Sequence, residues 1–163
     1  MNSIGIRPAA RDDSALIASL VRELADYERL SHEVEASEEM LADAMFGPSP
    51  RVFCDIVEHH GAPAGFALWF YSFSSFRGRH GLWLEDIFVR PAFRGRGLGK
   101  ALLAHLARRC VTEGLGRFEW SVLDWNAQSI AFYEAQGATI MQEWKICRMS
   151  GAALDELARR KAS

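Results

Sequence analysis

Apolar side chains recur at helical spacing in two parts of the chain. Behind Asp12 and Asp13, either of which can cap a helix, the apolar positions are Leu16, Ile17, Leu20, Val21, Leu24 and Tyr27. Between residues 98 and 113 the apolar positions are Leu102, Leu103, Leu106 and Cys110. Spacings of three and four residues place each set on one helix face. The pattern therefore predicts two amphipathic helices that pack against a core.

Shorter apolar blocks predict strands between further helices. Strands are predicted over residues 3–8, 52–58, 64–71, 82–89, 117–123 and 139–149, the last as a strand or a hairpin. Helices are predicted from Ser37 to about Phe46, over residues 127–136 behind Asn126, and after Ser150. Strands that alternate with helices are typical of an α/β sandwich around one sheet. No repeat, low-complexity stretch or linker divides the chain, so we expect a single domain over residues 1–163.

Composition limits the compartment and the partners. With 163 residues, of which 49% are hydrophobic and 25% charged, the chain can bury one full core. No apolar run approaches the roughly 20 residues of a membrane-spanning helix, and the N-terminus lacks a signal-peptide pattern. Three scattered cysteines indicate neither a disulfide framework nor a zinc site, so we expect a cytoplasmic protein without a metal. A net charge of −2 argues against a nucleic-acid partner.

The predicted strand over residues 82–89 carries two consecutive acids, Glu85 and Asp86. Because burying a carboxylate in an apolar strand costs free energy, acids in this position indicate a function, such as that of a base. His80, in the polar segment before this strand, is an alternative base. Residues 28–39 contain five acids and one base. This acidic stretch either attracts a cationic substrate or forms a solvated surface.

The acidic strand leads into a glycine-rich loop, Arg94-Gly95-Arg96-Gly97-Leu98-Gly99-Lys100, which opens the second predicted helix. Backbone N–H groups at a helix start bind phosphate. The loop is not a Walker A motif, because Arg94 stands in the place of its first glycine and Ala101 in the place of its hydroxyl residue. Its Gly-x-Gly-x-Gly spacing also differs from a dinucleotide fingerprint.

Arg94, Gly97 and Gly99 form the pattern Arg-x-x-Gly-x-Gly, which resembles the pyrophosphate loop of the GCN5-related N-acetyltransferases (GNAT), a family that binds acetyl-CoA. Residues 84–91, Leu-Glu-Asp-Ile-Phe-Val-Arg-Pro, extend the resemblance upstream. It implies the GNAT fold, an α/β fold with a central mixed, mostly antiparallel sheet, a bulged and splayed strand pair, and helices on both faces. It also implies that a strand pairs with the pantetheine arm and the loop holds the pyrophosphate. The implied cofactor residues are Ile87, Phe88, Val89, Arg94, Gly95, Arg96, Gly97, Leu98, Gly99 and Lys100.

A second block, residues 122–138, resembles the family pattern Asn-x-x-Ala/Ser-x-x-Phe-Tyr. The resemblance implies that Asn126 and Ser129 contact the cofactor arm and that Tyr133 protonates or stabilises the leaving thiolate. It assigns the role of general base to Glu85, since a primary amine with a pKa near ~10.4 is mostly protonated at neutral pH. Asp86 points to the other strand face unless a bulge changes the parity, so it is interpreted as a structural acid.

The similarity covers nearly the whole chain and is greatest to the spermidine/spermine (diamine/thialysine) acetyltransferase subfamily. It rests on residues 23–28, Glu-Leu-Ala-Asp-Tyr-Glu, and on residues 123–126, Leu-Asp-Trp-Asn. It implies a substrate pocket lined by Tyr27, Glu28, Glu85, Glu119, Trp120, Ser121 and Glu143. Two departures concern this pocket: residues 138–144 are fewer than in the family's loop, and Glu119 and Trp120 differ from the polyamine enzymes.

The resemblance thus predicts an acetyl-CoA-dependent N-acetyltransferase that acts on a polyamine, a diamine or a lysine-like amino acid. No cysteine falls in the matching motifs, so we expect direct attack by the amine in a ternary complex. The family also implies a homodimer. A CoA-binding regulatory module without turnover is one alternative, which an assay of thiol release with an amine panel excludes or supports. A nucleotide-binding protein is another, and ATP or NAD would stabilise it against heat.

Overall fold

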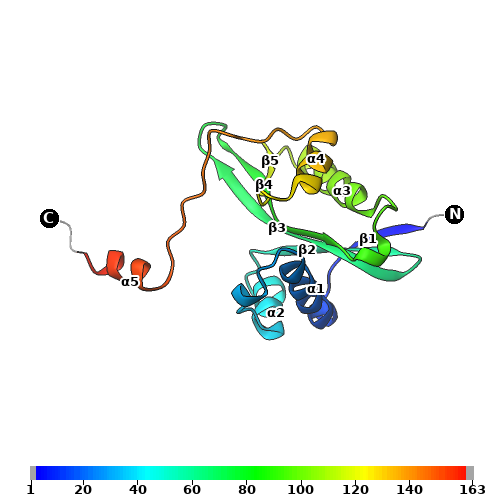
Figure 1. Cartoon of the computed structure of the whole chain (residues 1–163), viewed down its shortest axis with the longest axis horizontal. Helices are drawn as coiled ribbons and strands as arrows, with labels where there is room; N and C mark the ends of the chain where they lie inside the picture. The colour runs from blue at the N-terminus through cyan, green and yellow to red at the C-terminus, as the bar shows by residue number, and fades with distance from the viewer. Residues whose placement is uncertain (1–2, 161–163) are drawn as a thin grey trace. The chain divides into compact units, whose positions relative to one another are not determined.

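The computed structural model describes residues 3–160 (Figure 1). The chain forms two compact units, and the boundary in the sequence falls between Leu123 and Asp124. The first unit contains β1 (Ile4–Pro8), α1 (Ser14–Tyr27), α2 (Glu38–Phe46), β2 (Phe53–His59), β3 (Ala62–Ser74), β4 (Arg79–Val89), α3 (Leu98–Thr112) and β5 (Phe118–Trp120). It also contains three short 3-10 turns, η1 (Arg11–Asp13), η2 (Ser31–Glu33) and η3 (Pro91–Phe93). The second unit contains α4 (Ala127–Ala135) and α5 (Gly151–Arg159). The single domain expected from the sequence stays a prediction.

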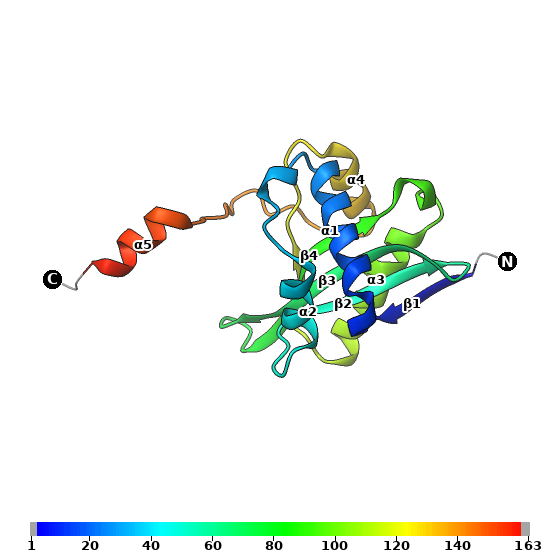
Figure 2. The same cartoon turned by 90° about the horizontal axis from the view of Figure 1, so that it is seen from below.

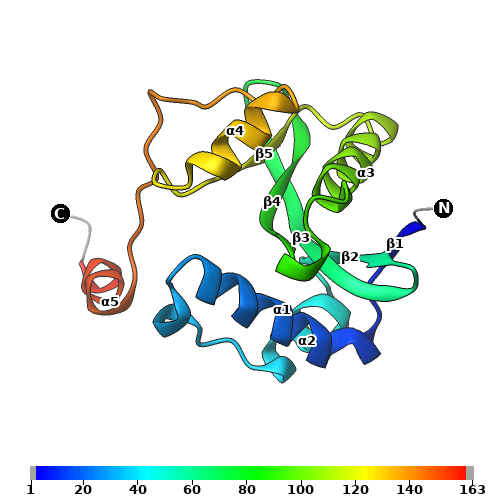
Figure 3. The same ribbon diagram turned by 45° about the vertical axis from the view of Figure 1, so that its right-hand side comes forward.

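The first unit is built on a five-stranded sheet in the order β1-β2-β3-β4-β5. Neighbouring strands from β1 to β4 are antiparallel, whereas β5 runs parallel to β4. α1 and α2 cover one face of this sheet and α3 covers the other (Figures 1 and 3). The mixed, mostly antiparallel sheet between helices confirms the predicted fold class.

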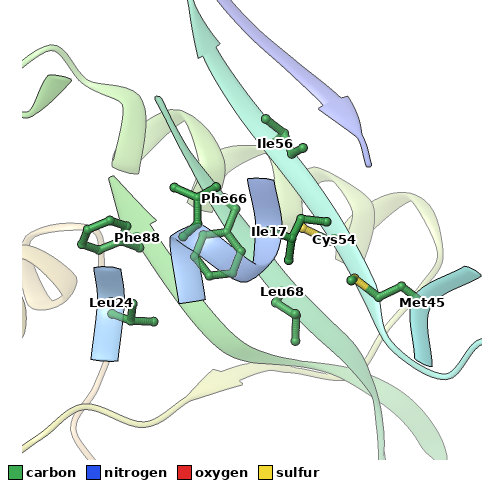
Figure 4. Close-up of a cluster of buried hydrophobic side chains, with 9 residues drawn as sticks. Ile17, Leu24, Met45, Cys54, Ile56, Phe66, Leu68 and Phe88 are labelled. Carbon is green, nitrogen blue, oxygen red and sulfur yellow. The ribbon is translucent and has the colours of Figure 1, made fainter. Parts of the chain in front are cut away.

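The face under α1 and α2 holds an apolar core (Figure 4). Ile17 and Leu20, from the predicted stripe of α1, are fully buried, and they pack with Phe66 of β3 and Phe88 of β4. Each fully buried side chain of this size contributes roughly 1.5–3 kcal/mol by leaving water. Figure 2 shows α1 lying over the sheet with α2 beside it. The stripe therefore sets the orientation of α1, which ends at Tyr27.

α3 packs on the opposite face through Leu98, Leu102 and Leu106, which are buried. Near its C-terminal end, the Arg109 guanidinium lies 4.8 Å from the centroid of the Trp69 ring. Trp69 Nε1 in turn donates a hydrogen bond of 2.8 Å to the buried carboxylate of Asp55. These contacts hold α3 against β2 and β3, and so hold the glycine loop at its N-terminus beside β4.

Several predicted boundaries differ from the structure. Residues 139–149, predicted as a strand or hairpin, have no regular secondary structure, so this prediction is wrong. β5 covers only Phe118–Trp120, in the first half of the strand predicted over residues 117–123. β3 and β4 extend through the polar segment that the strand predictions omitted, as far as Ser74 and Arg79. An antiparallel ladder satisfies backbone groups whatever the polarity of exposed side chains, which explains this extension.

Two of the helix caps expected from the sequence make their hydrogen bonds, whereas Asp13 and Ser150 stand at N-cap positions without one. Ser37 accepts a hydrogen bond from Met40 N at the start of α2, and Asn126 accepts one from Ser129 N at the start of α4. Asp13 stands at the N-cap position of α1, but its side chain makes no cap hydrogen bond to α1. It accepts instead from Ala10 N at 2.8 Å and pairs with Arg7 at 2.7 Å.

Candidate active site

β4 is bulged at its two acids. Leu84 pairs with Trp69 of β3, yet Asp86 pairs with the next residue, Leu68, so Glu85 is an extra residue in the ladder. Leu68 and Trp69 are adjacent in β3 and therefore point to opposite faces of the sheet. Their partners Asp86 and Leu84 must do the same, although they lie two positions apart in β4. A bulge of this kind re-aims the side chains beside it. The bulge implied by the family resemblance is present, and it changes the parity of Asp86.

The re-aimed Asp86 is the more unusual of the two acids. It lies on the face that α1 covers, because its partner Leu68 belongs to the core on that face. Burial, together with the smaller effects of the nearby charges of Glu85 and Glu28, raises the pKa of Asp86 to about 7. Burial also raises the pKa of Glu28. Carboxyl groups with such shifts are frequent in catalytic sites, because they exchange protons near neutral pH.

Glu85, the base expected from the resemblance, has a different environment. Its side chain is exposed and accepts a hydrogen bond of 2.9 Å from Trp83 Nε1. The structural role given to Asp86 rested on strand parity, which the bulge reverses. The register of a bulge is not visible in a single sequence, so sequence reasoning left the face of Asp86 open and interpreted it as a structural acid. The available signal was the acid doublet itself, which no regular strand buries on both faces without a cost.

His80, the alternative base, lies far from this point. It pairs with Phe73 across the hairpin, and its exposed ring contacts the Phe73 ring at 5.3 Å between centroids. Asp86 follows His80 by six positions in the strand, which corresponds to roughly 20 Å along β4. The structure therefore does not bring His80 to the acids.

The outer edge of β4 becomes unpaired at the bulge. The pairing with β5 ends at Leu84 and Trp120, so in the described part of the first unit no strand follows the outer edge of β4 from Asp86 to Val89. Ile87 and Val89 are half-buried, whereas the side chain of Phe88 lies in the core (Figure 4). An unpaired strand edge offers backbone donors and acceptors to an extended ligand. The backbone groups of Ile87 and Val89 alternate with those of Phe88, whose carbonyl oxygen lies against Gly65 of β3.

The glycine loop has the backbone of an anion site. Gly95 and Gly97 have φ values of +74° and +83°, in the left-handed region that favours glycine. A Cβ atom at either position would meet no other atom within 4 Å, so the space in front of the backbone is open. Gly97 is the N-cap of α3, whose first N–H groups face outward without intrahelical partners. Gly99 and Lys100 lie in that first turn, and the side chain of Leu98 is buried in the core.

The three cations of the loop differ in their contacts. Arg96 and Lys100 are exposed, where they add positive charge. Arg94 instead folds back, and its guanidinium carbon lies 4.7 Å from the centroid of the Tyr27 ring and 5.5 Å from that of Phe88. Tyr27 and Phe88 also contact each other, at 6.5 Å between centroids. The structure therefore joins residues that the sequence assigned separately to the amine pocket and the cofactor.

The other predicted pocket residues of the first unit lie on or after β5. Glu119 stands opposite Trp83 in the parallel ladder and forms an ion pair of 3.0 Å with Arg117. Trp120 is half-buried and Ser121 is exposed. Since Trp83 donates to Glu85, Glu119 and Glu85 both border the same indole.

The second unit contains the remaining predicted residues. Asn126 is buried and its side-chain oxygen caps α4 by accepting from Ser129 N at 3.2 Å. Tyr133 is also buried, two helical turns after Asn126. Glu143 is exposed in the segment without regular structure that follows α4. The catalytic and binding roles of these residues stay predictions.

A cavity of about 200 Å³ lies apart from these residues, beside the end of β1. Phe46, Phe53, Asp55, Trp69 and Arg109 are among its lining residues, and none of the predicted site residues is. Within residues 3–160, no three His, Cys, Asp or Glu side chains gather in a way that could hold a metal ion. No helix in this range has the length and apolar character needed to cross a membrane.

Acetyltransferases are found both by the family model and among the related sequences that match this chain. A model of the acetyltransferase (GNAT) family matches residues 17–138. Thialysine N-epsilon-acetyltransferase of Bos taurus is 37% identical over 169 residues, which cover 97% of this chain and 99% of that protein. L-ornithine N5-acetyltransferase NATA1 of Arabidopsis thaliana is 33% identical over 197 residues, which cover 93% of this chain and 86% of that protein.

Solved structures show the same fold. The integron cassette protein VCH_CASS6 from the mobile metagenome of V. cholerae superposes with a TM-score of 0.80 at 26% identity, over 97% of this chain and 99% of that chain. An aminoglycoside acetyltransferase from an uncultured soil sample, meta-AAC0020, superposes with a TM-score of 0.75 at 12% identity, over 90% and 95%. At this low identity, the second likeness concerns the fold alone.

Proposed function

This chain belongs to the acetyltransferase (GNAT) family, and we propose on that basis that it moves an acetyl group from acetyl-CoA to a primary amine of a small molecule. One observation carries the proposal: the unpaired edge of β4 leads, within a few residues, into the glycine turn at the start of α3. An edge that can pair with an extended arm, followed by an anion site, suits a ligand with a pantetheine arm and a diphosphate.

Acetyl-CoA supplies the acetyl group as an activated thioester. Ile87, Phe88 and Val89 hold the arm along the stretch of β4 that β5 leaves unpaired in the first unit. The N–H groups of residues 95–100 bind the diphosphate, with Arg96 and Lys100 as neighbouring charges. Asn126 and Ser129 complete the cosubstrate site in this proposal.

Asp86 accepts the proton of the attacking amine, and Glu85 acts by raising the pKa of Asp86. A general base is most effective when its pKa lies near the working pH, and the pKa of Asp86 is raised to about 7. The exposed carboxylate of Glu85 contributes to this shift by like-charge repulsion. Tyr133 protonates the departing thiolate. The amine attacks the thioester directly in a ternary complex, without an acyl-enzyme.

The substrate proposed is the side-chain amine of a lysine- or ornithine-like amino acid, with diamines and polyamines as the next candidates. The relatives named for thialysine and ornithine support this choice. Tyr27 offers an aromatic face to an ammonium group, and Glu28 offers a carboxyl one residue later. Glu119, Trp120, Ser121 and Glu143 complete the proposed pocket.

An amine panel tests the function directly. Purified chain is mixed with acetyl-CoA and, separately, with thialysine, lysine, ornithine, putrescine and spermidine, and thiol release is measured. We expect the amino acids to give the fastest release. Uptake of CoA in a calorimeter without thiol release for any amine would support the regulatory-module alternative instead. Thermal stabilisation by ATP or NAD but not by CoA would favour a nucleotide-binding protein.

We also propose a homodimer in a reducing, cytoplasmic compartment. Residues 141–160 are all exposed, and they include the large apolar side chains Met141, Trp144, Ile146, Met149, Leu154 and Leu157. Exposed apolar stretches of this extent mark interaction surfaces, and a second copy offers the outer edge of β5 as a strand partner. Cys54, Cys110 and Cys147 are all free thiols, which suits a reducing compartment.

A further inference from the structure

Arg94 contacts both proposed substrate sites at once. Its Nε donates a hydrogen bond of 2.9 Å to the carbonyl oxygen of Val89, on the strand edge assigned to the pantetheine arm. Its guanidinium lies over the Tyr27 ring, on the side assigned to the amine. Guanidinium–ring contacts of this kind are worth about 0.5–1 kcal/mol when exposed. A single cationic side chain therefore occupies groups that each substrate needs.

The side chain of Arg94 makes fewer hydrogen bonds than that of Arg90, four residues before it. Arg90 forms hydrogen bonds of 2.8, 3.0 and 3.2 Å with the Glu23 carboxylate of α1, and another with Pro63 O. These bonds tie α1 to the end of β4. Among the described residues no carboxylate pairs with Arg94, and its two terminal nitrogens donate no hydrogen bond. Arg94 is thus the movable cation beside a fixed one.

We infer that Arg94 is a latch between the two sites, which covers Tyr27 until the phosphates of the cosubstrate draw its guanidinium to the glycine loop. The inference rests on the proposed function. Arg94 directly precedes Gly95 in that loop, and its free terminal nitrogens suit a bidentate bond to phosphate. On moving, it releases the Val89 carbonyl and the face of Tyr27 together. Arg94 is in this sense a positioning residue rather than a catalytic one.

The latch makes the binding of the amine and the binding of the cosubstrate cooperative. A cationic amine that approaches Tyr27 meets a like charge while Arg94 lies over the ring, which weakens its binding. The same ring face becomes available when Arg94 has moved to the phosphates. Because such coupling is reciprocal, the amine also increases the affinity for the cosubstrate.

Calorimetry on the whole chain tests the latch, with CoA as a cosubstrate that transfers nothing and thialysine as the amine. In the wild type, we expect saturating CoA to tighten thialysine binding on the order of tenfold, within the usual range of coupling between two sites. Arg94→Ala should weaken CoA binding, tighten thialysine binding in the absence of CoA and remove the coupling. Arg94→Lys keeps a charge but not the planar fork that binds phosphate in a bidentate way and stacks on Tyr27, so it should reduce CoA affinity and the coupling, each by less than Arg94→Ala does.

Arg96→Ala is the matched control, since Arg96 is an exposed cation of the same loop. It should weaken CoA binding and leave the coupling unchanged. If the Arg94 variants bind CoA and show the wild-type coupling, or if thialysine binds equally with and without CoA or not at all, the latch is wrong. If the wild type takes up no CoA, the proposed function fails, and the latch fails with it.

Discussion

At the scale of single residues, the position of Asp86 depends on one extra residue in a strand. Without the bulge at Glu85, Asp86 and Leu84 would share a face; with it, Asp86 turns to the face covered by α1. The doublet was visible in the sequence, and so were the glycines of the loop, because both are local patterns. The consequence for Asp86 was not, since the parity of a bulged strand depends on its pairing with β3.

The raised pKa of Asp86 predicts a pH dependence with a defined sign. The folded chain holds a proton on Asp86 up to pH about 7, whereas the ordinary value is 3.8. The folded state therefore binds more protons than the unfolded state between these values, and stability falls as pH rises through this window. Activity changes in the opposite direction, because only the ionised form accepts a proton. We expect the ratio of wild-type to Asp86→Asn kcat/KM to rise with pH up to about 7.

Taking a ratio cancels the ionisation of the amine, which affects both proteins equally. Above pH 8, Asp86→Asn should also raise the free energy of unfolding by about 1–3 kcal/mol, because it removes a buried charge. Glu85→Gln is the informative control, since it removes a neighbour whose charge raises the pKa of Asp86. It should shift the activity inflection to lower pH. Loss of the inflection in Glu85→Gln, with its retention in Asp86→Asn, would return the role of base to Glu85.

At the scale of elements, the sequence predicted the features that depend on neighbouring residues better than those that depend on pairing with a distant strand. α1 and α3 were predicted because a stripe of leucine and isoleucine is visible within one helix. Residues 139–149 have a strand-like composition, but a strand also needs a partner edge, which no local pattern provides. The same dependence explains why β5 is shorter than predicted. Helices and strands with a clear apolar pattern of their own were thus found, whereas the ends of β3, β4 and β5 depend on pairing and were not.

The attachment of α3 to the sheet predicts a measurable stability difference. Trp69→Phe removes the indole that donates to Asp55, whose side chain is only 3% exposed, so it leaves a buried carboxylate short of a partner. Such a loss costs about 1–3 kcal/mol. Tyr71→Phe is the control, because it removes an exposed hydrogen bond of 2.6 Å to Glu113. Urea unfolding should show a larger loss for Trp69→Phe, and equal losses would mean that Asp55 does not depend on the indole.

At the scale of the whole molecule, the prediction concerns the segment from Met141 to Arg160, all of it exposed. Stable interfaces bury about 800 Å² per partner, and one aromatic side chain can supply 150–250 Å² of this. Trp144 is 74% exposed and Ile146 is 69% exposed, so the segment holds much of the apolar area required. We therefore expect light scattering to give a particle of twice the 18.3 kDa mass of the chain.

The double variant Trp144→Asp with Ile146→Asp places two charges in that interface, and burying unpaired charges costs more than the lost apolar contact alone. It should be monomeric at micromolar concentration. Val111→Asp introduces the same kind of change on α3, where Val111 is 83% exposed, and should remain dimeric. A monomeric wild type would contradict the prediction, and so would a double variant that stays dimeric. A monomeric variant that keeps its fold also shows, in the amine assay, whether Tyr133 of α4 works without a second copy.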